Sequence, residues 1–470
     1  MTHAVVIGGG VGGLAAAKRL AASGIDVTLC EAKASLGGLA QALDASAVRF
    51  DGGPYILLDP VGLGWAFEEL GLDLDALALR KIEDVYEVER ADAPPVHVYA
   101  DLHRTADALE ASYPEHGARY RRFVEKTTRI HEALAPLQVQ GRPSPLQLVR
   151  QGAAWHAPFL LSPLARVLAR AGLRGAVADA LGIWTHVAGQ SMHSAPSPLA
   201  LVPAMIHGPG CYVPTRGLAA IPELLAEHMQ HARITVRTDA HVARIQSERG
   251  HVTGVTLQSG EVITADLVIS DASGVATLVE LAETPPNVRD EAAALPLQSP
   301  GVAAYVLAEE RAEGPYLRFR LEPDHPDAPC RLLVRPGALP NADPKGPWPV
   351  RIVAPLAHEV AERLGEAGQN ALLGSILAEP WIQQRVGPFR EVARLVPATW
   401  GKRHALWRDS MNPVMTARFM RQGRLPHRIA TPEGLFLVGS STHPGQWVSF
   451  CMISGVLGAD EALRWLEHPH

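Results

Sequence analysis

Short apolar runs alternate with amphipathic stretches at the start of the chain. Residues 4–7 (Ala-Val-Val-Ile) are continuous and mostly β-branched, which predicts a buried parallel strand. Residues 14–22 carry an apolar face at helical spacing, and residues 26–30 are strand-like again. This strand–helix–strand order is typical of an α/β fold with a parallel sheet.

Similar patterns recur much later in the chain. We expect strands over 234–245, 265–270 and 434–438, a hairpin formed by 252–257 and 261–264, and a last helix over 448–465. Proline-rich breaks at 93–95 and 337–349 predict surface loops. The late strands would return to the first sheet, so one domain is expected to be built from separated segments.

Composition narrows the classes of function. The chain has 470 residues, 47% hydrophobic and 20% charged, which indicates two or three folded domains. A formal net charge of −6 argues against a nucleic-acid partner. The four cysteines form no CxxC pair, which argues against a disulfide framework and suits a reducing cytoplasm. Only six of the 43 Lys and Arg residues are lysines, which we interpret as a GC-rich, bacterial coding bias.

Targeting and metal signals are not found. No apolar run has the length needed to span a bilayer, and the glycine-rich start lacks the basic residues of a secretory signal. The twenty histidines show no HExxH or paired Cys/His spacing, so no metal site is expected.

The strongest chemical signal lies between the first strand and the first helix. Gly8, Gly10 and Gly13 have the spacing GxGxxG, with Gly12 inside it. These glycines are expected to make a tight turn, admit a pyrophosphate and let the helix pack on the strand, with free N–H groups at the helix start facing the phosphates. Glu31 ends the second strand and is placed to accept hydrogen bonds from a ribose. The pattern predicts a dinucleotide site but does not separate NAD from FAD.

Two further motifs resemble the flavoprotein family of amine oxidases and phytoene desaturases. Gly37-Gly38 follows Glu31 at the spacing of that family, and the segment 50–54 (Phe-Asp-Gly-Gly-Pro) resembles its F-D-x-G-P turn near the flavin. Leu39 stands where the family has an arginine. The resemblance implies FAD, held noncovalently.

The far end of the chain resembles the phytoene desaturase branch in particular. The strand 434–438 runs into 439–445 (Gly-Ser-Ser-Thr-His-Pro-Gly), similar to the G-x-x-T-H-P-G turn of that branch, and Ser440 stands where amine oxidases have an acid. N–H groups of this turn and of the following helix could face the flavin ring, where reduction places negative charge. Trp447 replaces a small residue of the branch and would reshape the pocket.

A middle segment supports the resemblance. Residues 212–217 are similar to the family's Y-P-x-G-G segment, and Val242 matches a valine whose backbone meets the adenine in that family. The likeness covers residues 1–60, 208–275 and 430–466. It implies the cofactor-binding residues Gly8, Gly10, Gly12, Gly13, Glu31, Gly38, Leu39, Gly53, Pro54, Val242, Gly439, Ser440 and Val448.

The expected fold is α/β, with a Rossmann-type FAD-binding domain and an interleaved α+β substrate-binding domain. The FAD-binding domain would comprise residues 1–85, 205–285 and 410–470. The substrate-binding, membrane-facing domain would comprise residues 86–204 and 286–409.

One stretch stands out by its charge. Residues 133–178 contain no Asp or Glu but five arginines, among them Arg166 and Arg170, interleaved with apolar residues and Trp155. This pattern is typical of a helix lying in a membrane interface, and equally of a helix packed on the second domain with a basic outer face. The first alternative predicts a cytoplasmic protein bound peripherally to the inner face of the membrane.

The predicted function is a FAD-dependent desaturase that passes a hydride from an apolar polyene of the carotenoid type to the flavin. Three alternatives stay open: a redox-neutral polyene isomerase using reduced flavin, an amine oxidase-like enzyme, and a flavin-bearing scaffold without turnover. Trp400, Trp407 and Trp447 are candidates for the substrate pocket. The motifs name no catalytic acid or base, and the oligomeric state is open.

Overall fold

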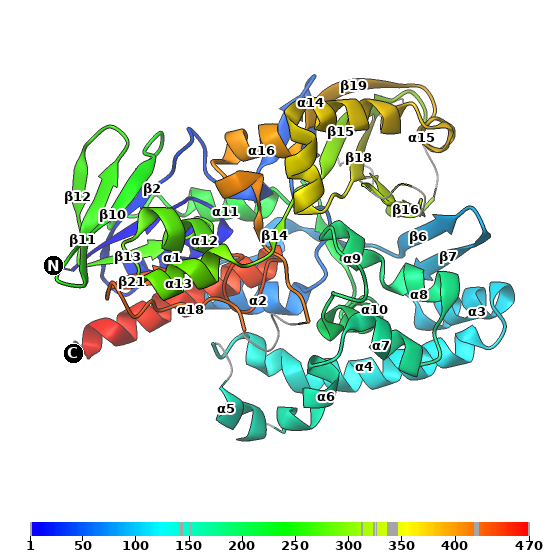
Figure 1. Cartoon of the computed structure of the whole chain (residues 1–470), viewed down its shortest axis with the longest axis horizontal. Coiled ribbons are helices and arrows are strands. Elements are labelled where there is room, and N and C mark those ends of the chain that lie inside the picture. Colours follow the sequence, from blue (N-terminus) through cyan, green and yellow to red (C-terminus); the bar gives the residue numbers. More distant parts are fainter. Residues whose placement is uncertain are drawn as a thin grey trace.

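The computed structural model places two β-sheets side by side, with a group of helices below the second sheet (Figure 1). It describes residues 2–141, 144–150, 152–311, 314–322, 325, 327–335, 346–417 and 423–468.

The first sheet is parallel and has the strand order β21-β13-β1-β2-β9. Its strands come from three separated parts of the chain: β1 (His3–Ile7) and β2 (Asp26–Cys30), β9 (Ile234–Arg237) and β13 (Leu267–Ser270), and β21 (Leu435–Leu437). The predicted strands at 4–7, 26–30, 265–270 and 434–438 are therefore present and pair with one another. All five strands run the same way, so their carboxyl ends meet at one edge of the sheet.

Side chains alternate between the two faces of this sheet. Ala4 and Val6 of β1 join the core formed with helices α1 (Val11–Ala22) and α18 (Val448–Glu467), which pack closely together. Val5 and Ile7 join a second core under the antiparallel strands β10 (Val242–Glu248), β11 (His251–Leu257) and β12 (Val262–Thr264). Both faces of the sheet are covered, which explains why its strands read as continuous apolar runs.

The second sheet has seven strands in the order β19-β15-β18-β17-β16-β6-β7. Neighbouring strands are antiparallel except β16 and β6. Their bounds are β6 (Asp84–Arg90), β7 (Ala93–Tyr99), β15 (Val302–Ala308), β16 (Leu317–Leu321), β17 (Cys330–Val334), β18 (Trp348–Ala354) and β19 (Phe389–Leu395). Helices α14 (His358–Leu377) and α15 (Pro380–Val386) cover one face of this sheet and share a core with β15 and β18.

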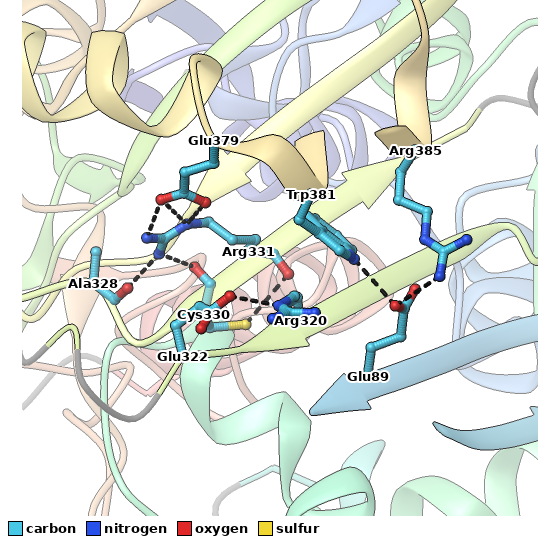
Figure 2. Close-up of polar contacts among 9 residues, drawn as sticks. All are labelled: Glu89, Arg320, Glu322, Ala328, Cys330, Arg331, Glu379, Trp381 and Arg385. Atoms are coloured by element: carbon cyan, nitrogen blue, oxygen red, sulfur yellow. Dashed lines mark hydrogen bonds and ion pairs between the residues drawn. The ribbon is translucent and has the colours of Figure 1, made fainter. Parts of the chain in front are cut away.

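Buried ion pairs fix the α15 region to this sheet (Figure 2). Arg331 of β17 has no exposed surface, and its guanidinium donates to the Glu379 carboxylate at 2.6 Å. The Trp381 indole N–H and the Arg385 guanidinium both donate to Glu89 of β6, at 3.1 and 2.9 Å. A buried charge is tolerated only when it is paired, so this network has a structural role.

Ten helical segments connect β7 to the short strand β8 (Tyr212–Pro214) in the part of the chain that the structure describes. They are α3 (Leu102–Ser112), α4 (His116–Gln138), α5 (Pro145–Arg150), η3 (Ala153–His156), α6 (Ala157–Leu160), α7 (Leu164–Arg170), α8 (Gly175–Leu181), α9 (Ile183–Val187), η4 (Ser197–Leu201) and α10 (Val202–His207). Figure 1 shows α5 and α6 at the lower end of this group.

The remaining elements are short or join the two sheets. They are the helices η1 (Gly38–Ala40), α2 (Pro60–Glu69), η2 (Leu74–Leu77), α11 (Ala220–Glu227), α12 (Gly274–Ala276), η5 (Thr277–Leu281), α13 (Pro286–Ala293), α16 (Pro397–His404) and η6 (Trp407–Asp409), and the strands β3 (Ala42–Ala45), β4 (Val48–Asp51), β5 (Leu79–Lys81), β14 (Leu297–Gln298) and β20 (Asn412–Pro413).

Three expectations about elements are wrong. The strand expected over 234–245 is two strands in different sheets, because the chain turns at Asp239, whose φ is +53°. The loop expected at 93–95 begins β7, an edge strand, where prolines cost no ladder hydrogen bond. The stretch 133–178 is not a single helix but the end of α4 followed by several short helices, interrupted by prolines and glycines, and its contact with a membrane stays a prediction.

Two other expectations cannot be scored here. Most of the predicted loop at 337–349 lies outside the described residues. The boundaries of the FAD-binding domain (1–85, 205–285 and 410–470) and of the substrate-binding domain (86–204 and 286–409) stay a prediction.

Candidate functional site

The glycine-rich loop lies where the carboxyl end of β1 meets the start of α1. Gly8 has a φ of +94°, a conformation that favours glycine and forms the tight turn. A Cβ on Gly13 would collide with the carbonyl oxygen of Gly8, so only glycine lets the helix approach the strand this closely. Gly10 is the N-cap of α1 and supplies no side-chain cap of its own, so the first N–H groups of the helix face the space that its bare backbone leaves open.

Glycines from distant parts of the chain surround this loop. A Cβ on Gly12 would lie 2.9 Å from the Cα of Gly439, and a Cβ on Gly38 would lie 2.9 Å from the Cα of Gly10. Helices α1 and α18 also pack closely, because a Cβ on Gly455 of α18 would lie 2.7 Å from the Cβ of Ala15 in α1. The first and last glycine motifs predicted from the sequence are therefore adjacent. Their bare backbones form a cradle that side chains would fill.

Glu31 closes the cradle at the end of β2. Its side chain is buried and accepts hydrogen bonds from the backbone N–H groups of Gly9 (2.7 Å) and Lys33 (3.0 Å). The carboxylate is thus held at the rim of the glycine loop, in the position expected of a ribose acceptor. A glycine cradle, a helix N-terminus without a side-chain cap from its N-cap residue and a fixed carboxylate are a set of groups that fits a dinucleotide.

The turn after β4 is held by contacts with both neighbouring regions. The Asp51 carboxylate accepts a hydrogen bond from the N–H of Ala219 at 3.1 Å, which ties the turn to the segment after β8. Burial raises the pKa of Asp51, while N–H groups of Leu218 and Ala219 and the charge of Arg351 oppose that rise. Arg351 of β18 donates to the Gly53 carbonyl oxygen.

The second sheet also reaches this turn through an aromatic side chain. The Tyr305 hydroxyl of β15 donates to the carbonyl oxygen of Gly52 at 2.8 Å. Gly53 and Pro54 are half-buried, and Leu39 is half-buried in η1 with its carbonyl beside Gly53. The second sheet therefore positions the backbone of a predicted flavin turn that belongs to the first part of the chain.

The C-terminal turn is fixed by hydroxyl groups. The Gly439 N–H donates to the Ser454 hydroxyl at 2.9 Å, and the Thr442 hydroxyl donates to the Gly439 carbonyl oxygen at 2.9 Å. Arg424 donates to the carbonyl oxygen of Ser440 at 3.0 Å. Val448 is the first residue of α18 and is half-buried, so the helix N-terminus begins directly after this turn.

His443 of this turn makes structural hydrogen bonds that favour a structural role over a catalytic one. Its ring Nε2–H donates to the carbonyl oxygens of Leu137 (3.0 Å) and Gln138 (3.2 Å) at the end of α4. Burial lowers the pKa of His443 to about 4, so the ring is neutral at physiological pH. The histidine links the flavin turn to the helical region.

The three predicted pocket tryptophans differ in their surroundings. Trp400 is buried on α16, and its ring lies 3.8 Å from a Cβ built on Gly52. Trp447 is the N-cap of α18 and stacks on Phe450 with ring centroids 4.9 Å apart. Trp407 is half-buried and donates its indole N–H to Glu280 at 2.6 Å. Their role in a substrate pocket stays a prediction.

Val242 is the first residue of β10 and is buried. It pairs with Leu257 of β11, and the nearby Ala240 N–H donates to the Glu31 carbonyl oxygen at 2.8 Å. The structure thus brings this residue near Glu31, and its contact with the adenine stays a prediction.

Sequence reasoning missed two charged residues at the site. Arg351 is the one charge within an otherwise apolar strand, a signal that could have marked it. Asp271 follows directly after the buried strand β13, at the sheet edge where parallel strands place ligands, and its carboxylate lies against Gly10, Gly12 and Gly439.

Among the residues that the structure describes, no group of histidine, cysteine and acidic side chains could hold a metal ion. Within the same residues, no helix is long and apolar enough to cross a membrane.

Comparisons with known proteins agree with this geometry. Residues 6–67 match the NAD(P)-binding Rossmann-like domain family. The chain is 27% identical to a zeta-carotene-forming phytoene desaturase of Myxococcus xanthus, over 98% of this chain and 94% of that protein. It is 24% identical to a phytoene desaturase of Fusarium fujikuroi, over 98% and 89% of the two chains.

Solved structures share the fold at low sequence identity. Wild-type putrescine oxidase bound to putrescine aligns with a TM-score of 0.65 at 14% identity, over 98% of this chain and 99% of that one. A CLA-producing fatty acid isomerase from P. acnes aligns with a TM-score of 0.65 at 15% identity, over 99% and 98%.

The fold and the converging glycine motifs make this chain a protein with a Rossmann-type nucleotide-binding domain. Over nearly its full length the chain is similar to phytoene and other carotenoid desaturases.

Proposed function

We propose that this protein desaturates an apolar polyene of the carotenoid type. The observation that carries the proposal is the full-length likeness to desaturases that act on such substrates, combined with a dinucleotide cradle whose two glycine motifs meet. When bound, the flavin supplies the hydride acceptor. The residues of the chain bind and orient it and keep the reacting carbon in reach.

The N-terminus of α18 is the group best suited to assist the reaction. Trp447 is the N-cap of this helix and makes no side-chain hydrogen bond to it, so its side chain does not pair the first N–H groups of α18. Partial positive charge at this end stabilises negative charge that develops nearby. Because that charge appears only on reduction, the stabilisation lowers the barrier rather than strengthening cofactor binding.

The substrate would come from a membrane. Four large apolar side chains are exposed within 146–161: Leu146, Val149, Leu161 and Trp155, whose exposed fraction is 87%. Exposed arginines lie among and beyond them, at Arg150, Arg166, Arg170 and Arg174, whereas Arg142 lies outside the described residues. Apolar side chains flanked by arginines are typical of a surface that rests on anionic lipid.

The helical region that carries this surface contacts the predicted flavin turn through α4. His443 contacts the end of α4, and α5 with its exposed Leu146 and Val149 starts a few residues later. A lipid-dissolved polyene that leaves the membrane here would enter the same helical region that contacts the predicted flavin turn.

Product analysis tests the proposed function. Purified protein is incubated with a C40 or C30 polyene in micelles, and products are identified by mass and absorption. Desaturation removes two hydrogens per step and moves the absorption to longer wavelength. An isomer of unchanged mass would support the redox-neutral isomerase instead, and turnover of an amine alone would support the amine oxidase. A flavin-loaded protein that converts none of these compounds would support the scaffold.

A further inference from the structure

A second carboxylate lies inside the dinucleotide cradle. Asp271 follows β13, the strand next to β1, and its backbone N–H donates to the Ile7 carbonyl oxygen at 2.8 Å. This bond holds the residue at the carboxyl edge of the sheet, directly beside the glycine loop. The GxGxxG motif accounts for Glu31 but assigns no role to this acid.

The Asp271 side chain occupies the space that the glycines leave open. A Cβ on Gly12 would lie 2.5 Å from its Oδ1, and one on Gly439 would overlap the same oxygen. A Cβ on Gly10 would overlap Oδ2. One carboxylate therefore touches the N-terminus of α1 and the C-terminal flavin turn together.

The N–H groups that face this carboxylate are those of the helix start. The amides of Gly13 and Gly10 interact with Asp271, and both belong to the loop expected to bind the diphosphate. The carboxylate is thus an internal anion at an anion-binding position. The residue still keeps part of its surface accessible although protein atoms pack closely around it, so an incoming ligand could reach it.

The surrounding charges disfavour a second anion here. Burial raises the pKa of Asp271 to about 7; the N–H groups of Gly13 and Gly10 oppose that rise, and the negative charge of Glu31 adds to it. From α18, the Cys451 thiol faces the same region, and burial raises its pKa so that it stays neutral. The glycines of α1 and of the C-terminal turn contribute no charge. Arg424 reaches Ser440 at 3.0 Å, one residue beyond Gly439.

We propose that Asp271 binds the cofactor diphosphate as a carboxylic acid, donating its O–H to a phosphate oxygen, so that FAD binds together with one proton. An ionised carboxylate could not share these N–H groups with a doubly charged diphosphate, because two anions within hydrogen-bond distance repel each other strongly in a buried site. Protonation changes the Asp271 side chain from an anion that competes with the diphosphate into a hydrogen-bond donor to it. This inference rests on FAD binding and is independent of the substrate.

Flavin retention as a function of pH tests the inference. The purified holoprotein is diluted serially at each pH from 5.5 to 9, and released FAD is measured by its fluorescence at equilibrium. For the wild type, the dissociation constant should be nearly constant below pH 6 and rise toward about tenfold per pH unit above pH 8, as one-proton linkage requires. Asp271→Asn keeps a hydrogen-bond donor and cannot ionise, so its dissociation constant should stay nearly flat. At pH 8.5 it should retain FAD more tightly than the wild type by roughly tenfold or more.

The controls separate this effect from general loss of stability. Asp266→Asn removes an exposed carboxylate from the start of the same strand region and should keep the wild-type pH slope. Asp271→Ser offers a second uncharged donor if the Asn variant does not fold. A wild-type dissociation constant that does not change with pH would overturn the inference, and so would an equal slope in Asp271→Asn. Neither result would touch the proposed desaturation, which is measured separately by its products.

Discussion

At the scale of single residues, Glu31 determines the shape of the glycine loop. Its two carboxylate oxygens each accept one backbone hydrogen bond, from Gly9 and from Lys33. The residue predicted to accept hydrogen bonds from a ribose therefore also holds the loop.

Replacing Glu31 tests this role. Glu31→Ala removes charge-assisted hydrogen bonds of about 1.5–3 kcal/mol, so FAD affinity should fall roughly 10- to 150-fold. Released flavin fluorescence on dilution measures this directly. Glu31→Gln, which keeps one acceptor oxygen, should lose less affinity. If Glu31→Ala retains FAD as tightly as the wild type, the side chain does not serve the cofactor.

Val448 offers a test of the helix N-terminus. Val448→Pro deletes one N–H donor at the first helical position, where proline is well tolerated. The reduction rate of bound flavin should fall roughly 10²–10³-fold, as on loss of one oxyanion-hole donor, with FAD still bound. Val448→Ala, which keeps the N–H, should react at close to the wild-type rate. An unchanged rate in Val448→Pro would exclude this donor from the reaction.

At the scale of elements, the sequence predicts a strand correctly where burial leaves a local apolar pattern. It fails where the position of the element in the fold decides the structure. The strands of the first sheet were predictable because burial on both faces makes them continuous apolar runs. The boundary between β9 and β10 was not, since it depends on a turn at Asp239 that no glycine or proline marks. Likewise, the prolines of β7 signal a loop unless the edge position of the strand is known.

The candidate site was predictable only in part. The glycine motifs and Glu31 lie close together in the sequence or carry a known spacing, so they could be found. Arg351 and Asp271 reach the site from other strands, and only the order of the strands places them there. When only the order of the strands places a residue at the site, the neighbouring sequence gives little sign of its role.

The helices α5–α7 support a prediction about membranes. The exposed apolar residues and arginines of this region should bind the protein to anionic liposomes at low salt. Binding should weaken with added salt, because surface charges are screened beyond about 8 Å at physiological ionic strength. Co-sedimentation with vesicles measures it.

Charge reversal supplies a matched comparison. The double variant Arg166→Glu/Arg170→Glu should no longer co-sediment with the liposomes. The control Arg249→Glu/Arg289→Glu makes an equal charge change at exposed arginines elsewhere and should bind like the wild type. If wild-type protein never co-sediments at low salt, the helices pack as an ordinary basic surface of the fold.

At the scale of the whole molecule, both sheets contribute residues to the candidate site. The first sheet supplies the glycine cradle, while Arg351 and Tyr305 of the second sheet hold the turn at Gly52 and Gly53. The helical group contributes contacts to His443 and the exposed apolar surface. The C-terminal turn and the helical group are thereby connected through a direct contact.

The central claim is that a polyene reduces the flavin of this protein. The most direct measurement is anaerobic mixing of the holoprotein with a C40 or C30 polyene in micelles, following flavin absorption and then identifying the product. The account predicts bleaching of the oxidised flavin, with one new double bond formed per flavin reduced. Flavin that stays oxidised with every polyene but bleaches with an amine would contradict it.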